Sequence, residues 1–85
     1  MTWTVIVAKP ARKQLARFPA NDRNKIAATI RTMAENPFGG GIIKLEGENN
    51  RWRRRAGSYR IFFTIVTSSR TLAVSAIVRR TSTTY

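Results

Sequence analysis

Ten consecutive residues carry most of the side chains in this sequence that could do chemistry. The stretch from Arg51 to Arg60, RWRRRAGSYR, contains five arginines and two aromatic residues but no acid. A hydrophobic run from Ile61 to Val66 follows at once, so we expect the arginines to be held on a folded sheet. Rigid guanidinium groups are well suited to binding phosphate. The stretch therefore predicts a phosphate-binding surface, with a solvated basic face that binds nothing in particular as the alternative.

Strand alternation divides these arginines into two groups. In an extended strand Arg51, Arg53 and Arg55 point to one face, and Trp52, Arg54 and Ala56 point to the other. Arg60 follows a tight turn and can join the first group. Arg54 is expected to face solvent or the helices without a special role. Trp52 is expected to anchor the sheet in preference to stacking on a base.

Composition points to an anionic partner and excludes several kinds of chemistry. The 85 residues include 16 Lys and Arg but 4 Asp and Glu, which gives a formal charge of +12. Nucleic acid is the first candidate partner, followed by an acidic protein and a membrane surface. Because cysteine and histidine are absent, thiolate chemistry is excluded, and we expect neither a metal site nor a cofactor. No apolar run approaches the roughly 20 residues of a membrane span, and the start is unlike a signal peptide. We expect a cytoplasmic protein.

The remaining pattern predicts one α+β domain spanning 1–85. Residues 3–7 alternate like a strand, an apolar helix face runs from Pro10 to Pro19, and a second helix runs from Asn21 to Glu35. The glycines at 39–41 lack a phosphate-loop pattern and are expected to form a flexible connection, with a short extended piece at 42–45.

Three further strands are predicted at 51–56, 59–66 and 70–79, with turns between them. Leu72, Val74, Ala76 and Val78 are expected to share one face of the last strand. The predicted order is β-α-α-β-β-β, with a helical hairpin packed on a twisted antiparallel sheet.

From end to end, the chain resembles the RelE/ParE superfamily of toxins from bacterial toxin–antitoxin modules. The resemblance is carried by the first strand and by segments 11–15 (ARKQL), 35–37 (ENP), 44–47 (KLEG), 52–61 (WRRRAGSYRI) and 77–80 (IVRR), together with Tyr85. It implies the RelE-like fold, which is usually classed with microbial ribonuclease-like folds.

The two branches of this superfamily do different things. RelE-like members enter the ribosomal A site and cut messenger RNA, whereas ParE-like members inhibit DNA gyrase and are not nucleases. RelE-like sites carry two basic residues spaced by one, an arginine after the turn tyrosine, an arginine that ends the last strand, and a tyrosine near the C-terminus. The positions matching that set are Arg53, Arg55, Arg60, Arg79 and Tyr85. The resemblance therefore favours a metal-independent endoribonuclease, with Lys44, Arg51 and Arg80 expected to contact the RNA.

The chemistry implied by this resemblance uses the RNA's own 2′-hydroxyl as the nucleophile. Arg53 and Arg60 would hold the phosphate, Arg79 would lie near the leaving oxygen, and Tyr85 would orient or stack on the substrate. The family often has lysines where this chain has Arg53 and Arg55. Because an arginine does not lose its proton, Arg55 is a poor general base. Tyr85, its pKa lowered by arginines, or the ribosome itself are the alternatives.

The resemblance also implies partners. We expect a cognate acidic antitoxin that covers the basic surface, the ribosome and its messenger RNA, and DNA only indirectly through the antitoxin complex. Two alternatives remain: a ParE-like gyrase inhibitor, and a plain nucleic-acid-binding module whose RNA affinity would depend steeply on salt.

Overall fold

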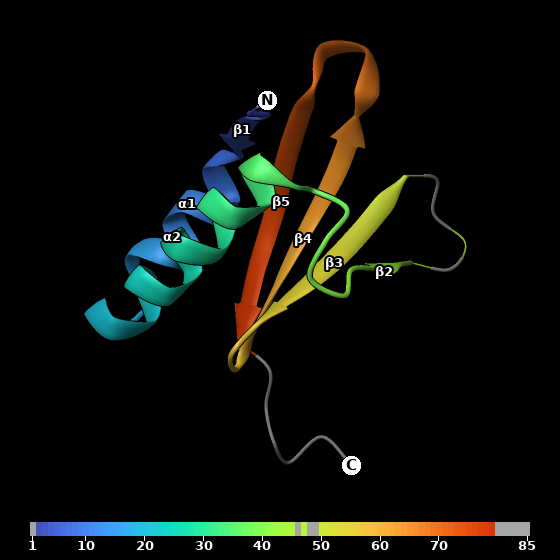
Figure 1. The fold of residues 1–85 in the computed structure, drawn as a ribbon. Helices are drawn as coiled ribbons and strands as arrows, with labels where there is room; N and C mark the ends of the chain where they lie inside the picture. Colours follow the sequence, from blue (N-terminus) through green and yellow to red (C-terminus); the bar gives the residue numbers. More distant parts are fainter. Residues whose placement is uncertain (1, 46, 48–49, 80–85) are drawn as a thin grey trace.

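The predicted order of helices and strands is confirmed. The computed structural model describes residues 2–45, 47 and 50–79 (Figure 1). Along the chain the elements are β1 (Thr4–Val7), α1 (Lys9–Ala16), α2 (Ala20–Glu35), β2 (Ile43–Lys44), β3 (Arg51–Ala56), β4 (Tyr59–Val66), the short 3-10 helix η1 (Thr67–Ser69) and β5 (Thr71–Arg79). The extended piece expected at 42–45 is the two-residue strand β2.

The described strands form one sheet in the order β1-β5-β4-β3-β2. The pairs from β2 to β5 are antiparallel, as predicted for consecutive strands joined by short turns. β1, however, runs parallel to β5, with Thr4 opposite Thr71 and Val7 opposite Val74. The sheet is therefore mixed, because the helical hairpin carries the chain from β1 across to the far edge before it returns to β5.

Both helices lie on the same face of the sheet (Figure 1). Pro10 falls in the first turn of α1, where a missing backbone N–H does no harm, and Asp22 falls in the first turn of α2. The core between the layers is apolar: Ile26 and Met33 from α2 and Phe63 from β4 are completely buried. Trp52 packs against this core, as expected. No helix in the described part of the chain is long and apolar enough to cross a membrane.

An extra residue in β5 changes which of its side chains face the helices. Phe63 pairs with Val74, but its neighbour Phe62 pairs with Ala76, so Ser75 has no partner residue in β4. The expectation that positions 72, 74, 76 and 78 share one face is therefore wrong beyond Val74. After the bulge, Ile77 is buried on the helix side, while Val78 is 44% exposed. The opposite face of the sheet carries no described helix, and we call it the open face.

Candidate functional site

Cross-strand pairing gathers the predicted arginines on the open face. Arg55 pairs with Arg60 across the β3–β4 hairpin, and Arg53 pairs with Phe62. Direct partners in antiparallel strands project from the same side of a sheet. The predicted alternation is therefore present. Arg51, Arg53 and Arg55 share the open face with Arg60, while Trp52, Arg54 and Ala56 project toward the helices.

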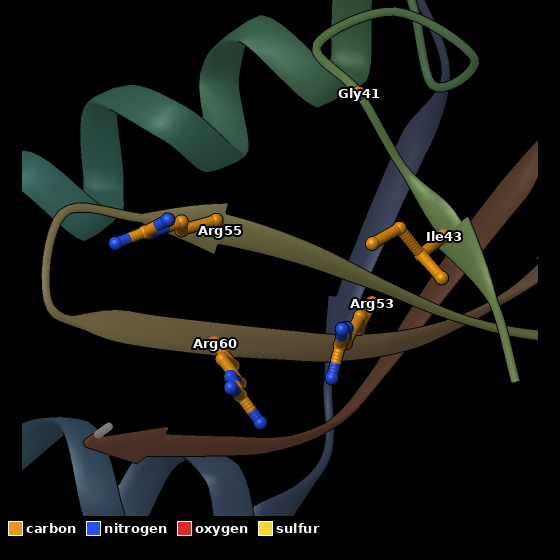
Figure 2. A pocket seen from close by; sticks show the side chains of 5 residues that line it. All are labelled: Gly41, Ile43, Arg53, Arg55 and Arg60. Carbon is orange, nitrogen blue, oxygen red and sulfur yellow. The ribbon is translucent and has the colours of Figure 1, made fainter. Parts of the chain in front are cut away.

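Three of these arginines line one pocket. It measures about 270 Å³ and is lined by Gly41, Ile43, Arg53, Arg55 and Arg60, which together we call the arginine pocket. Figure 2 shows the arginines on the neighbouring strands β3 and β4, with Ile43 beside Arg53 and Gly41 on the loop leading to β2. The volume lies just below the roughly 300 Å³ at which typical ligand sites begin, so a small anionic group suits it better than a large cofactor.

The described carboxylates lie away from the arginine pocket. Asp22 and Glu35 both belong to α2, on the helix side of the sheet. Within the pocket, the Arg55 Nε donates a long hydrogen bond of 3.4 Å to the Gly57 carbonyl. Three like charges on adjacent strands repel one another, and an anion placed among them would relieve that repulsion. The charge of the pocket is therefore suited to an anion such as phosphate.

An aromatic ring lies beside the pocket. Phe62 projects from β4 on the open face, and the Arg51 guanidinium lies over its ring, with the Cζ atom 5.7 Å from the ring centroid. Arg51 thus shares the face of the arginine pocket without lining it.

Arg54 has a structural role that the sequence did not suggest. It projects toward the helix side, where its guanidinium lies against Gly40: a Cβ built on Gly40 would come within 2.4 Å of the Arg54 Cζ. The Arg54 Nη1 is buried and has no hydrogen-bond partner in the described part of the protein. Gly40 and Gly41 both have positive φ, 78° and 70°, and Gly41 lines the arginine pocket. The glycine run was expected to be only a flexible connection, but its last residue, Gly41, lines the site, and the three consecutive glycines were the available signal.

Arg79 lies on the other side of the sheet from the arginine pocket. It pairs directly with Tyr59, whereas Arg60 pairs with Val78. The Tyr59 hydroxyl donates a 2.8 Å hydrogen bond to the Asp22 Oδ2, which joins β4 to α2. That hydrogen bond, burial and the Asp22 charge raise the pKa of Tyr59 above 10.0, and the positive charge of Arg79 acts in the opposite direction. Arg79 is exposed, is the last residue of β5, and directly follows Val78, the partner of Arg60.

The other residues predicted to contact RNA are placed less favourably or lie outside the description. Lys44 is exposed and pairs with Trp52, so it projects away from the open face. Arg80 and Tyr85 lie outside the described residues. Among the residues that are described, no three histidine, cysteine or acidic side chains come together in a way that could hold a metal ion.

Residues 5–83 match the family of ParE toxins of the type II toxin–antitoxin system parDE. The chain belongs to this family, within the RelE/ParE superfamily. It is therefore the toxin of a type II toxin–antitoxin module, as the sequence resemblance implied. A search of curated proteins found no match.

The fold of this toxin is that of solved RelE and ParE structures. It is similar to RelE in the archaeal RelE–RelB complex of Pyrococcus horikoshii, with a TM-score of 0.83, 22% identity, and 96% and 99% of the two chains covered. The isolated Escherichia coli RelE toxin gives a TM-score of 0.82 at 13% identity, covering 96% of this chain and 88% of RelE. A YoeB/ParE toxin of Agrobacterium tumefaciens gives 0.76 at 21% identity, covering 92% and 99%. At these identities the similarity establishes the RelE-like fold.

Proposed function

We propose that this toxin is a metal-independent endoribonuclease that cuts messenger RNA in the ribosomal A site. The observation that carries the proposal is the arginine pocket: Arg53, Arg55 and Arg60 line one pocket on the open face, and both described carboxylates belong to α2 on the helix side. Preorganised cations stabilise negative charge most where that charge develops during a reaction. Phosphoryl chemistry is the reaction class that gains most from such a site.

The proposed reaction uses the RNA's own 2′-hydroxyl as the nucleophile and requires no metal ion. The ribose 2′-oxygen forms a bond to the adjacent phosphorus, the bond from phosphorus to the 5′-oxygen breaks, and a 2′,3′-cyclic phosphate and a free 5′-hydroxyl result. Arg53 and Arg60 hold the phosphate oxygens as charge accumulates on the phosphorane. One proton leaves the 2′-hydroxyl and one reaches the 5′-oxygen. Arg79, at the end of β5, is proposed to lie near that leaving oxygen.

Neither Arg55 nor Tyr59 is suited to act as the general base. An arginine retains its proton, and Tyr59 is committed to Asp22 on the helix side with a raised pKa. Tyr85 and the ribosome remain our candidates for that proton transfer, as the sequence suggested.

The proposed partners follow from charge. A cognate acidic antitoxin would cover the basic surface of this +12 chain, and DNA would be contacted only indirectly through that complex. Ribosomes and messenger RNA would be met in the cytoplasm, with Arg51, Lys44 and Arg80 proposed as further RNA contacts.

The family match favours a second candidate function. Because residues 5–83 match ParE toxins, inhibition of DNA gyrase by binding, without catalysis, is the alternative. The two functions predict different products: cut messenger RNA in one case, and intact messenger RNA with inhibited supercoiling in the other.

Primer extension on messenger RNA from induced cells tests the proposal. We expect new 5′ ends within translated codons, and we expect Arg60→Ala to reduce cleavage by about 100- to 1000-fold, the usual loss when one preorganised donor is removed. Arg31→Ala is the matched control, because it removes the same charge from an exposed position on α2. It should cut like the unchanged toxin.

One result would reject the nuclease, and another would reject only the role of the arginine pocket in it. One is intact messenger RNA in growth-arrested cells whose purified toxin blocks gyrase supercoiling, which would establish the ParE-like alternative. The other is equal cleavage by Arg60→Ala and the unchanged toxin, which would remove the arginine pocket from the reaction.

A further inference from the structure

A row of side chains crosses the open face through Arg53. Ile43 of β2 pairs with Arg53, Arg53 pairs with Phe62, and Phe62 pairs with Ala76 of β5. The central cation of the arginine pocket thus has an apolar side chain on either side. Ile43 is 49% exposed, and it lines the pocket.

Phe62 is not part of the helix-side core. Its neighbours Ile61 and Phe63 are completely buried on the helix side, whereas Phe62 is half-buried on the open face. The Arg51 Cζ atom lies over the ring, 5.7 Å from its centroid, so a guanidinium group and an aromatic ring lie next to each other on the open face. Proteins use both kinds of group to stack exposed nucleobases.

The spacing between ring and pocket suits a nucleotide. Phe62 and Arg53 are direct cross-strand partners, and the Cβ atoms of such partners are typically about 5 Å apart. Phe62 and Arg60 are two residues apart on β4, where Cα atoms are typically about 7 Å apart. In a nucleotide one ribose joins the phosphate to the base, so a phosphate held by Arg53 and Arg60 would leave its base within reach of the ring.

We propose that Phe62, with Arg51 over it, is a stacking site for the base next to the phosphate held in the arginine pocket. The site selects single-stranded RNA, since a base must leave its duplex stack to reach the open face. This inference rests on the proposed function, because it takes RNA as the ligand of the pocket.

Binding of a short single-stranded RNA with 2-aminopurine at its centre tests this site. A 2′-O-methyl group on each ribose prevents cleavage, and a matched oligonucleotide lacks the central base. Phe62→Leu keeps an apolar side chain but removes the ring. We expect it to weaken binding of the base-containing oligonucleotide by about 5- to 150-fold, and to abolish the quenching of 2-aminopurine fluorescence that stacking produces. Binding of the abasic oligonucleotide should be unchanged.

Two further variants separate stacking from folding. Phe62→Tyr restores a ring and should restore both affinity and quenching. Val66→Ala changes another open-face side chain of β4, four residues away, and should alter neither. Equal losses for both oligonucleotides with Phe62→Leu, or no loss for either, would overturn the stacking site while leaving RNA binding by the pocket intact. Failure of the unchanged toxin to bind either oligonucleotide would overturn RNA binding by the isolated pocket and with it the stacking site, whereas cleavage on the ribosome is tested separately by primer extension.

Discussion

At the residue scale, Gly40 should tolerate substitution less well than other glycines with positive φ. Alanine at φ 78° is strained by about 1–2 kcal/mol, and its Cβ would also meet the Arg54 guanidinium. Gly47 has a similar φ of 74°, and no atom of the residues that the structure describes lies within 4 Å of an added Cβ. We therefore expect Gly40→Ala to lower the free energy of unfolding in urea by more than Gly47→Ala does.

The cause of that difference can be isolated by repeating both substitutions in an Arg54→Ala background. Without the guanidinium only the φ strain remains, so the two glycine variants should then lose similar stability. If the excess loss of Gly40→Ala persists in that background, the contact with Arg54 is not its cause. Gly41 follows Gly40 directly and lines the arginine pocket. We therefore also expect Gly40→Ala to weaken phosphate binding in the background that retains Arg54.

At the scale of elements, the hydrogen bond from Tyr59 to Asp22 links β4 to α2, and it should respond to pH. The pKa of folded Tyr59 is raised above the 10.0 of the unfolded chain. The stability this provides is complete below pH 10 and is lost as pH rises through the folded pKa. Asp22→Asn removes the charge and the strongest acceptor, so the pKa of Tyr59 should fall. Absorbance of tyrosinate, with Tyr59→Phe to identify the signal of Tyr85, measures the shift.

A comparison of unfolding midpoints at pH 8 and pH 11 checks the same link independently. The unchanged toxin should lose more stability between these values than Asp22→Asn, because its Tyr59 has the more strongly raised pKa. The other groups that change protonation in this range are present in both proteins. An equal loss of stability in the two proteins would show that the hydrogen bond from Tyr59 to Asp22 does not contribute to the pH dependence of stability.

Alternation and turn residues predicted the hairpins of this sheet, and with them the convergence of Arg53, Arg55 and Arg60. Two features were not predictable in this way. The bulge at Ser75 has no marker in a run of small and β-branched residues, yet it reverses the faces of Ile77 and Arg79. The contact between Arg54 and Gly40 depends on the path of a loop, which strand periodicity does not describe. Pairing patterns therefore predicted which arginines share one face, whereas the contact of the glycine loop with Arg54 and the side of Arg79 required coordinates.

At the scale of the whole molecule, positive charge covers both layers. Besides the open face, the two helices carry exposed cations at Lys9, Arg12, Lys13, Arg17, Arg23, Lys25 and Arg31. No described charged residue is buried as a whole, although the Arg54 Nη1 atom is buried. Folding concentrates these charges, so their repulsion is stronger in the compact state than in an extended chain.

Screening of these charges by salt should therefore stabilise the folded toxin. Raising sodium chloride from 0.01 M to 0.15 M shortens the Debye length from about 30 Å to about 8 Å, and we expect the midpoint of thermal unfolding to rise. Changing Lys9, Lys13 and Arg17 together to Gln removes three exposed cations from α1 and its end without touching the arginine pocket. That variant should melt higher at low salt and gain less from added salt. A midpoint that stays constant or falls as salt is added to the unchanged toxin would show that its +12 charge does not limit stability.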